Sequence, residues 1–417
     1  MTQTSGLDEV DPFEEFNRAM GADGDASPYP ELAEWRRGAP IFGGPIDLGE
    51  DAVGASHDVD ALVPTTMHVF TAYSFDAVQA VLGDGESFSS AGYAEVMGQV
   101  LGHSILEMDN PEHRAYRSLI QQAFTRKEME RWEAELVAPL VDRMIDEFVD
   151  DGHVDLVRAL FFPFPVNVIA ELMGLPPSDL PEFHRLAVEL ISVVNDFEKA
   201  VQASASLCEY FGELVHERRG SEGRDLISVL ANVRAPDGRQ LDDDEIFSFL
   251  RLLLPAGAET TYRSSSNLMF GLLSHPDQLE AVRADRSLLP QAIEEGLRWE
   301  PPLLTIVRTA TRDVEVCGVQ VPAGSTVVTN LGSANRDEQR WDDPDRFDIF
   351  RERRPHLAFA HGPHMCLGMH LARMETTVVL GALLDRLPQL RFDPAAEPAF
   401  ISGMTFRAPP RLAVTWG

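Results

Sequence analysis

Several kinds of residue and segment are scarce in this chain of 417 residues. Its three cysteines, Cys208, Cys317 and Cys366, are too dispersed for a disulfide framework and fit a reducing cytosol. No segment approaches the roughly 20 uninterrupted apolar residues that span a bilayer. Residues 1–15 are polar and acidic, without the basic and apolar regions of a signal peptide or membrane anchor. We therefore expect a cytoplasmic protein without a membrane anchor.

Positive charge is also scarce. Asp and Glu outnumber Lys and Arg by 67 to 35, which gives a formal net charge of -32. Such a surface repels nucleic acid and anionic membranes, so neither is an expected partner. The basic segment 351–354 stands out against this background. A docking patch for an acidic redox protein and a solvated turn with scattered ion pairs explain it equally well.

The periodicity of apolar residues indicates a mainly α protein with a minor β-sheet region. Residues 1–60 are rich in Asp, Gly and Pro and predict an irregular segment packed on the domain. No linker or repeat interrupts residues 61–417, which we expect to form one domain. The expected strands are 67–72, 305–312, 314–316, 319–321, 326–330 and 410–416. The expected helices are 74–82, most of 112–234, 242–275, 290–299 and 367–387. Residues 86–106 contain several glycines and are expected to form a loop.

The most informative stretch is 359–368, Phe-Ala-His-Gly-Pro-His-Met-Cys-Leu-Gly. Cys366 lies in a turn-prone loop, between Gly362 and Gly368 and directly before a long predicted helix. A helix start directs free N–H groups and the positive end of the helix dipole at the sulfur, and both favour the thiolate. Glycines on both sides suit a flat, bulky metal cofactor that approaches the backbone closely.

Two other interpretations of this loop are open. His361, His364 and His370 lie close enough in sequence to Cys366 to form a zinc cluster, although zinc sites usually pair their ligands at other spacings. An inert buried cysteine is the commonest fate of a free thiol in a globular protein. Neither interpretation accounts for the glycines.

A second motif lies in the middle of the long helix predicted over 242–275. It reads Ala256-Gly-Ala-Glu-Thr-Thr261, directly after a proline at which a kink is expected. Gly257 leaves room for a cofactor or substrate against the backbone. Glu259 and Thr260 place an acid beside an alcohol, which a proton relay needs. The alternative is a threonine that bonds back to the preceding turn.

Two pairs of charged residues have helical spacing. Glu295 and Arg298, at i and i+3, share a helix face and form at least a surface ion pair. His113 and Arg117, at i and i+4, also share a face and together suit one anionic group. Asp109 is the expected cap of that second helix.

In their order along the chain, these motifs resemble those of the cytochromes P450. The cysteine loop matches Phe-x-x-Gly-x-His-x-Cys-x-Gly at every fixed position. Residues 256–261 resemble the oxygen-activation motif, with Glu in place of the commoner Asp, and Glu295-x-x-Arg298 resembles the family's Glu-x-x-Arg. The resemblance runs from about residue 60 to the C-terminus. It implies the cytochrome P450 fold, a helix-rich triangular prism that holds haem between the long central helix and the cysteine-loop helix.

The resemblance also implies roles for individual residues. Haem b is the expected cofactor, with Cys366 as the axial thiolate ligand of its iron, and O2 is the expected co-substrate. Glu259 and Thr260 are implied to be catalytic and to deliver protons. The residues implied to contact haem are His113, Arg117, Ala256, Gly257, Arg308, Phe359, Gly362, His364, Cys366 and Gly368. A structural charged network is implied to join Glu295, Arg298 and Arg346, the last from Pro344-Asp-Arg346-Phe347.

A largely apolar pocket is implied for the substrate, which is therefore expected to be hydrophobic. Its expected lining is Tyr93, Val96, Met97, Val194, Leu253, Leu304, Ile306 and Met404. His103 and Arg263 are expected near an entrance.

The implied function is a monooxygenase that inserts one oxygen atom into a hydrophobic small molecule. The chain has no flavin or iron–sulfur motif, so its electrons are expected from a ferredoxin with its reductase or from a flavodoxin. The acid–alcohol pair at Glu259 and Thr260 favours oxygen plus reductant over peroxide. The alternative is a haem sensor that binds ligands without turnover, but a sensor has no need of that pair.

Overall fold

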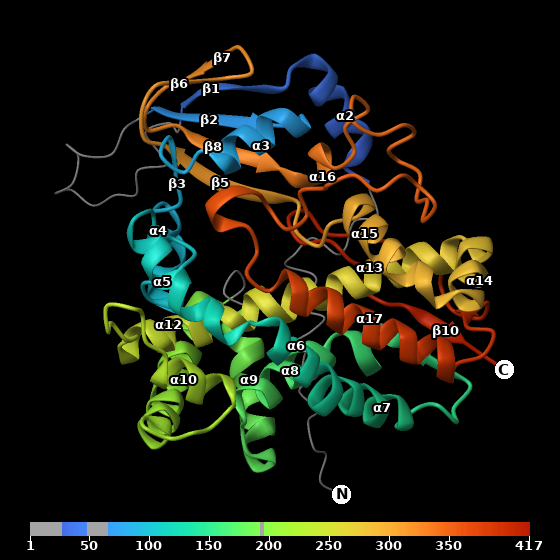
Figure 1. Ribbon diagram of the computed structural model, residues 1–417. Coiled ribbons are helices and arrows are strands. Elements are labelled where there is room, and N and C mark those ends of the chain that lie inside the picture. Colours follow the sequence, from blue (N-terminus) through green and yellow to red (C-terminus); the bar gives the residue numbers. More distant parts are fainter. Residues whose placement is uncertain (1–26, 48–65, 192–195) are drawn as a thin grey trace, which may run out of the picture.

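A computed structural model describes residues 27–47, 66–191 and 196–417 (Figure 1). The α-helices are α2 (Tyr29–Gly38), α3 (Phe75–Gly83), α4 (Tyr93–Leu101), α5 (Glu112–Ile120), α6 (Arg126–Trp132), α7 (Ala138–Asp146), α8 (Pro163–Met173), α9 (Leu180–Ile191), α10 (Phe197–Arg218), α11 (Leu226–Asn232), α12 (Asp243–Leu253), α13 (Thr260–Ser274), α14 (Pro276–Ala284), α15 (Leu289–Trp299), α16 (Leu331–Ala334) and α17 (Met369–Arg386). The strands are β1 (Ile41–Asp47), β2 (Thr66–Ala72), β3 (Phe88–Ser89), β4 (His153–Asp155), β5 (Thr305–Ala310), β6 (Val314–Val316), β7 (Val319–Val321), β8 (Thr326–Asn330), β9 (Arg391–Phe392) and β10 (Ala413–Thr415). None of the helices in these described ranges has the length and apolar character to span a membrane.

The largest sheet has five strands in the order β1-β2-β8-β5-β3. Strand β2 runs parallel to β8, and the other neighbours are antiparallel. Helix α3 packs against β8, and α2 and α16 lie beside the same sheet (Figure 1). Strands β4, β10 and β9 form a second sheet, in which the C-terminal β10 pairs with β4 from the middle of the chain. Strands from distant parts of the sequence therefore interlock, as one domain requires.

The helices form a larger layer on the other side of the molecule (Figure 1). Its centre is one helical run that begins at α12, continues through a π-helical stretch, η7 (Leu254–Glu259), and ends with α13. Asp242 caps this run in a reciprocal capping box with Glu245. Helices α15 and α17 both pack against α13. The cysteine loop, which leads into α17, is therefore held against the central helix.

Most of the expected elements are confirmed, and the helical run becomes π-helical at Pro255, where a kink was expected. The loop expected over 86–106 is wrong, because this segment contains β3 and the two-and-a-half-turn helix α4. The irregular segment expected over 1–60 is wrong for the part that the structure describes. Helix α2 lies there, and β1 pairs with β2 as an integral strand of the main sheet. Residues 1–26 and 48–60 lie outside the described ranges.

Candidate functional site

The cysteine loop is a compact turn held by its own backbone. The Cys366 N–H donates to the Phe359 carbonyl at 2.9 Å, and the Met365 N–H donates to the Gly362 carbonyl at 3.1 Å. Gly362 has a φ of +73°, and a Cβ there would lie 2.4 Å from the Leu82 carbonyl oxygen. Glycine is thus required at this position both by its backbone conformation and by the close approach of α3. A Cβ on Gly368 would meet no atom within 4 Å, so the backbone on the helix side of Cys366 is open.

The Cys366 thiol is buried among groups of opposing effect. Burial raises the pKa of the thiol, whereas a hydrogen bond from the Gly368 N–H and the charges of Arg117 and Arg373 lower it. The Gly368 N–H at the helix start favours the thiolate, as expected, but the net direction of the pKa is upward. Burial outweighs the helix start. A metal ion bound to the sulfur would supply the missing stabilisation, because a coordinating thiol loses its proton outright.

Four cationic or imidazole side chains converge beside this loop. Helix α5 contributes His113 and Arg117, β5 contributes Arg308, and the loop contributes His364. The His113 and His364 rings lie 4.1 Å apart between centroids, and Arg117 Nη2 donates to the Met365 carbonyl at 2.7 Å. The structure thus brings together residues that are scattered over the sequence.

This cluster is a buried region of positive potential. Burial, reinforced by His113, Arg308 and Arg117, lowers the pKa of His364 to about 3. Burial and the charge of Arg117 also lower the pKa of His113, which is 2% exposed. Among the described residues, His113 Nε2 has no hydrogen-bond partner. An unsatisfied buried nitrogen beside two guanidinium groups fits an anionic ligand with acceptor oxygens.

The one carboxylate that acts on the pKa values of this cluster, among the described residues, is Asp109. Its oxygens accept hydrogen bonds from the Ser89 hydroxyl and, at 3.0 Å, from the Ser90 N–H. The expectation that Asp109 caps α5 is therefore wrong, because Pro111 stands at that position without a side-chain cap. Asp109 instead fixes the turn before α4, and the Ser90 hydroxyl reaches His364 Nε2 at 3.2 Å.

The predicted acid–alcohol pair lies at the junction of η7 and α13. The Thr260 hydroxyl donates to the Ala256 carbonyl at 2.7 Å, the back-bonding alternative that the sequence left open. Ala256 is exposed and Thr260 half-buried, whereas Glu259 is 3% exposed and pairs with Arg263. The two groups therefore lie on different faces of the helix. Their predicted role as a relay stays a prediction.

Gly257 serves the packing of the helices. A Cβ at this position would lie 3.3 Å from Ile169 Cδ1 in α8, which is closer than most real Cβ contacts. The missing side chain thus lets α8 approach η7. The predicted contact of Gly257 with a cofactor stays a prediction.

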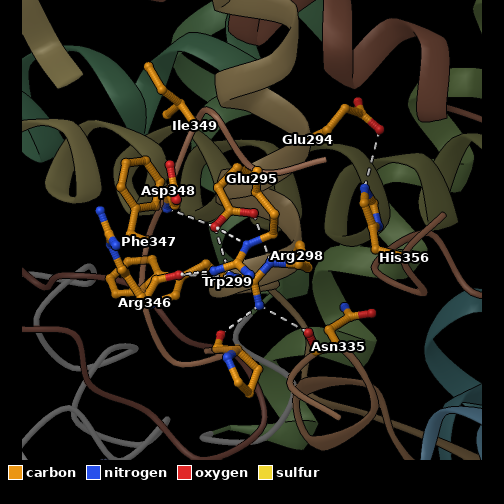
Figure 2. Close-up of polar contacts among 12 residues, drawn as sticks. Glu294, Glu295, Arg298, Trp299, Asn335, Arg346, Phe347, Asp348, Ile349 and His356 are labelled. Atoms are coloured by element: carbon orange, nitrogen blue, oxygen red, sulfur yellow. Dashed lines mark hydrogen bonds and ion pairs between the residues drawn. The ribbon is translucent and has the colours of Figure 1, made fainter. Parts of the chain in front are cut away.

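The Glu295–Arg298 pair is buried and forms the centre of a network (Figure 2). Arg298 Nε and Nη2 each donate to a carboxylate oxygen of Glu295 at 2.8 Å. Arg298 also donates to the carbonyls of Asn335, Pro344 and Arg346 at 2.7–3.1 Å. These contacts fasten α15 to the irregular segment that leads to the cysteine loop.

The expected contribution of Arg346 needs a correction. Arg346 is exposed and offers its backbone carbonyl, whereas Arg351 Nε lies 3.4 Å from Glu295 and supplies the third charged group. Arg351 also donates to the carbonyls of Asp343 and Arg346 at 2.9 Å. Because its guanidinium is used internally, Arg351 cannot belong to a surface docking patch.

The predicted substrate pocket stays a prediction, and the structure shows the surroundings of its expected lining residues. The Tyr93 hydroxyl accepts from the Val307 N–H at 3.1 Å, which joins α4 to β5. Leu304 is 2% exposed and packs with Tyr29, Leu32 and Tyr73 in a small core cluster.

Other predicted pocket residues have varied surroundings. Ile306 packs partly into the core beside the sheet, Met97 and Leu253 are half-buried, and Met404 is 80% exposed. Val194 and the side chain of Val96 lie outside the described residues.

His103 and Arg263 were both expected near an entrance to the pocket, but His103 is exposed and Arg263 is buried. The His103 ring bonds Glu107 at 2.6 Å and Glu112 at 2.8 Å, contacts that raise its pKa, and more than half of its side chain is exposed. Arg263 is 2% exposed, so a position at an entrance is wrong. Its partner Glu259 stands four residues earlier on the helix, a spacing that could have identified the pair.

One buried carboxyl was missed entirely. Glu375 in α17 is 3% exposed, and burial raises its pKa to about 8, opposed by a hydrogen bond from Thr261. Nothing in the local sequence distinguishes Glu375 from a surface residue, because only the packing of α17 on α13 buries it.

The zinc interpretation is not supported. Within residues 27–47, 66–191 and 196–417, no three or more His, Cys, Asp or Glu side chains are grouped so that they could hold a metal ion. Cys366 with a single open coordination side therefore suits a metal that brings most of its own ligands, as the iron of a macrocycle does.

Comparisons with known proteins agree with this chemistry. The family model described as Cytochrome P450 matches residues 179–403. The cytochrome P450 monooxygenase PikC of Streptomyces venezuelae is 37% identical over 389 residues, which cover 90% of this chain and 87% of that protein. The steroid C26-monooxygenase of Mycobacterium tuberculosis is 35% identical over 345 residues, which cover 80% of this chain and 92% of that protein. The crystal structure of CYP109E1 from Bacillus megaterium in complex with testosterone has a TM-score of 0.82 at 31% identity, covering 94% of this chain and 100% of that one.

Proposed function

Because the chain belongs to the cytochrome P450 family of haem oxidoreductases, we propose that it is a monooxygenase that uses O2 to oxidise a hydrophobic small molecule. One observation carries the proposal. The partly buried Cys366 lies beside a backbone that is open at Gly368, and it is grouped with the guanidinium of Arg117 and the unsatisfied imidazole nitrogen of His113. Haem offers iron for the thiol and two propionates for the cations, so the residues present fit it.

His113, Arg117, Arg308 and His364 would hold the propionates, and the Cys366 sulfur would bind the iron. The fit rests on charge as well as shape. Within the part of the chain that the structure describes, the carboxylate that acts on this cluster is Asp109, whose oxygens are already engaged by a serine hydroxyl and a backbone N–H. Two propionates would neutralise the remaining positive potential, as buried charges require.

When bound, haem supplies the oxygen chemistry, and a thiolate ligand favours O–O cleavage. The chain itself holds the cofactor, shields the site from water and supplies protons. The Gly368 N–H, Arg117 and Arg373 stabilise negative charge on the Cys366 sulfur. Arg373 stays in place through contacts with Glu294 at 2.6 and 2.8 Å, and its guanidinium lies 4.5 Å from the Phe359 ring centroid.

We infer that Thr260 and Glu259 deliver protons during the activation of oxygen. The Thr260 hydroxyl must leave the Ala256 carbonyl to donate elsewhere, and the π-helical stretch before it loosens the ladder there. Glu259 is a buried carboxyl whose pKa is raised by burial and lowered by Arg263. The net direction is upward, so the protonated acid is favoured more than in a free glutamate, and such a carboxyl is a candidate proton donor.

We infer separate electron donors, a ferredoxin with its reductase or a flavodoxin, and a cytoplasmic location, which three free cysteines support. Relatives include a nocardicin C N-oxygenase, a cyclomarin C epoxidase and structures with testosterone and corticosterone. A hydrophobic substrate of comparable size is therefore proposed. Titration with testosterone and corticosterone, followed by the haem spin-state change, tests it; no spectral change with either would remove steroids from the proposed class.

The function is tested by the spectrum of the reduced, CO-bound protein. We expect the red-shifted Soret band of thiolate-ligated haem, its loss in Cys366→Ala, and its retention in Cys317→Ala, a matched change at an exposed cysteine. Absence of the band from the wild-type protein, or its persistence in Cys366→Ala, contradicts the proposal. A normal band without product in the presence of NADPH, reductase and ferredoxin would point to a sensor.

A further inference from the structure

Glu259 and Arg263 form a buried ion pair one turn apart at the centre of the molecule. Arg263 Nε and Nη2 each lie 2.5 Å from the same oxygen, Oε1, of Glu259. The side chains are 3% and 2% exposed. Glu259 Oε2 has no hydrogen-bond partner among the described residues. The pair thus leaves one buried carboxylate oxygen unsatisfied, which is costly for a contact that serves stability alone.

A buried pair elsewhere in the same chain shows the contrast. Glu295 engages both oxygens with Arg298 and also accepts from the Asp348 N–H at 2.9 Å. That carboxylate is fully satisfied, as a structural pair should be. Glu259 instead keeps one oxygen ready to receive a proton, on the residue directly before Thr260.

The charged surroundings of Glu259 are simple. Burial raises its pKa, and Arg263 is the one charge that lowers it among the described residues. The Tyr262 hydroxyl is a titratable group next to Glu259 and Arg263. The guanidinium carbon of Arg263 lies 5.8 Å from the ring centroid of Phe406 in the C-terminal loop. Ionisable groups on the helices packed against η7 engage other partners: Glu171 with Arg143, His184 with Asn167, Glu189 with Arg185, Glu245 with Arg239, and Arg251 with Ser204.

Resting on the monooxygenase function proposed above, we propose that Arg263 is a positioning residue that holds the Glu259 carboxylate away from Thr260 and sets the pH range in which Glu259 exchanges protons. While paired, the carboxylate accepts a proton at Oε2. The protonated acid binds Arg263 more weakly, because the charge–charge attraction is lost. It is then free to turn, give up the proton, and return to Arg263 as the carboxylate.

The first test measures the protonation of Glu259 without turnover. The infrared spectrum of the haem-loaded ferric protein is recorded against pH, and the carboxylic acid C=O band that is absent from Glu259→Gln is assigned to Glu259. We expect Arg263→Met to move the midpoint of this band upward by about 1–3 pH units, because an adjacent cation lowers a carboxyl pKa by about that amount. Arg263→Lys keeps the charge and should leave the midpoint near that of the wild type.

An unchanged midpoint in Arg263→Met would overturn the proposal. If Arg263→Met does not fold, Arg263→Gln removes the charge while keeping polar atoms, and the same upward shift is expected of it.

The second test uses the pH profile of product formed per reductant consumed. A purely structural role for Arg263 would lower the whole profile without displacing it, whereas the proposed role displaces its Glu259 limb to higher pH. Failure of the underlying function is distinguishable. In that case the wild-type protein lacks the thiolate Soret band, while the infrared midpoint still shifts. If only the role of Arg263 is wrong, the Soret band is normal and the midpoint does not move.

Discussion

Replacing Glu375 by glutamine should remove a pH dependence of stability that this one carboxyl imposes. Glu375 is 3% exposed in α17 and faces α13, where Thr261 is its hydrogen-bonding neighbour. Burial raises its pKa from 4.5 to about 8. Glutamine has nearly the same shape and no charge, so it reproduces the protonated form that the folded protein prefers.

The size of the effect follows from the two pKa values. The folded-state pKa is above the unfolded one, so the folded protein binds an extra proton between them. The stabilisation relative to the ionised form is complete below pH 4.5 and is lost as the pH rises through about 8. The slope is about 1.4 kcal/mol per pH unit in this window, which amounts to about 3 kcal/mol between pH 5 and pH 7.

The assay is chemical denaturation of the haem-loaded protein at several pH values from 5 to about 8. The quantity to follow is the difference in the free energy of unfolding between Glu375→Gln and the wild type. We expect this difference to grow in favour of Glu375→Gln as the pH rises. Glu397→Gln, a matched change at an exposed glutamate, should show no such trend. Parallel pH curves for Glu375→Gln and the wild type would refute the reasoning.

Three further changes have definite expectations. Thr260→Ala should lower the amount of product formed per NADPH consumed, because it removes the hydroxyl that is proposed to deliver protons. Unchanged product per NADPH would contradict that role of Thr260. Arg298→Met removes one charged partner of a buried pair and should cost about 3–5 kcal/mol of unfolding free energy; a loss below about 1 kcal/mol would contradict the network. Gly362→Ala should destabilise more than Gly152→Ala in thermal unfolding. Both have a positive φ, but only the first would clash, with the Leu82 carbonyl; equal losses would show that the clash is relieved.

The sequence predicted the helices and strands well where periodicity is long or caps are strong. The central run begins at Asp242, as its three aspartates indicated, and the four strands between residues 305 and 330 are where the turn residues placed them. Helix α4 was missed because its glycines favour a loop, but tertiary contacts hold it. The Val100 carbonyl accepts from Ser204 Oγ at 2.6 Å, and Arg251 Nη1 supports that serine at 2.8 Å. Such contacts between distant segments are invisible to local pattern.

The candidate site was predictable as a set of residues but not in its bonding. The resemblance to the cytochromes P450 implied that His113, Arg308 and His364 act together, and the structure places them side by side. The resemblance could not say which of two nearby arginines completes the Glu295 network, because the turns over 343–351 decide which guanidinium points inward. Arg351 does, and Arg346 contributes only its carbonyl.

Burial is the property that sequence conveys least, and it determines the pKa of two carboxyl groups near α13, Glu259 just before this helix and Glu375 in α17. Glu259 and Glu375 are the same residue type, and on a surface helix each would be an ordinary carboxylate. Burial raises the pKa of both groups. The charge of Arg263 opposes this rise at Glu259, whereas at Glu375 the opposing group among the described residues is the Thr261 hydroxyl, and the pKa reaches about 8. One neighbour therefore separates a group that can exchange protons from one that acts as a neutral hydrogen-bonding contact between helices.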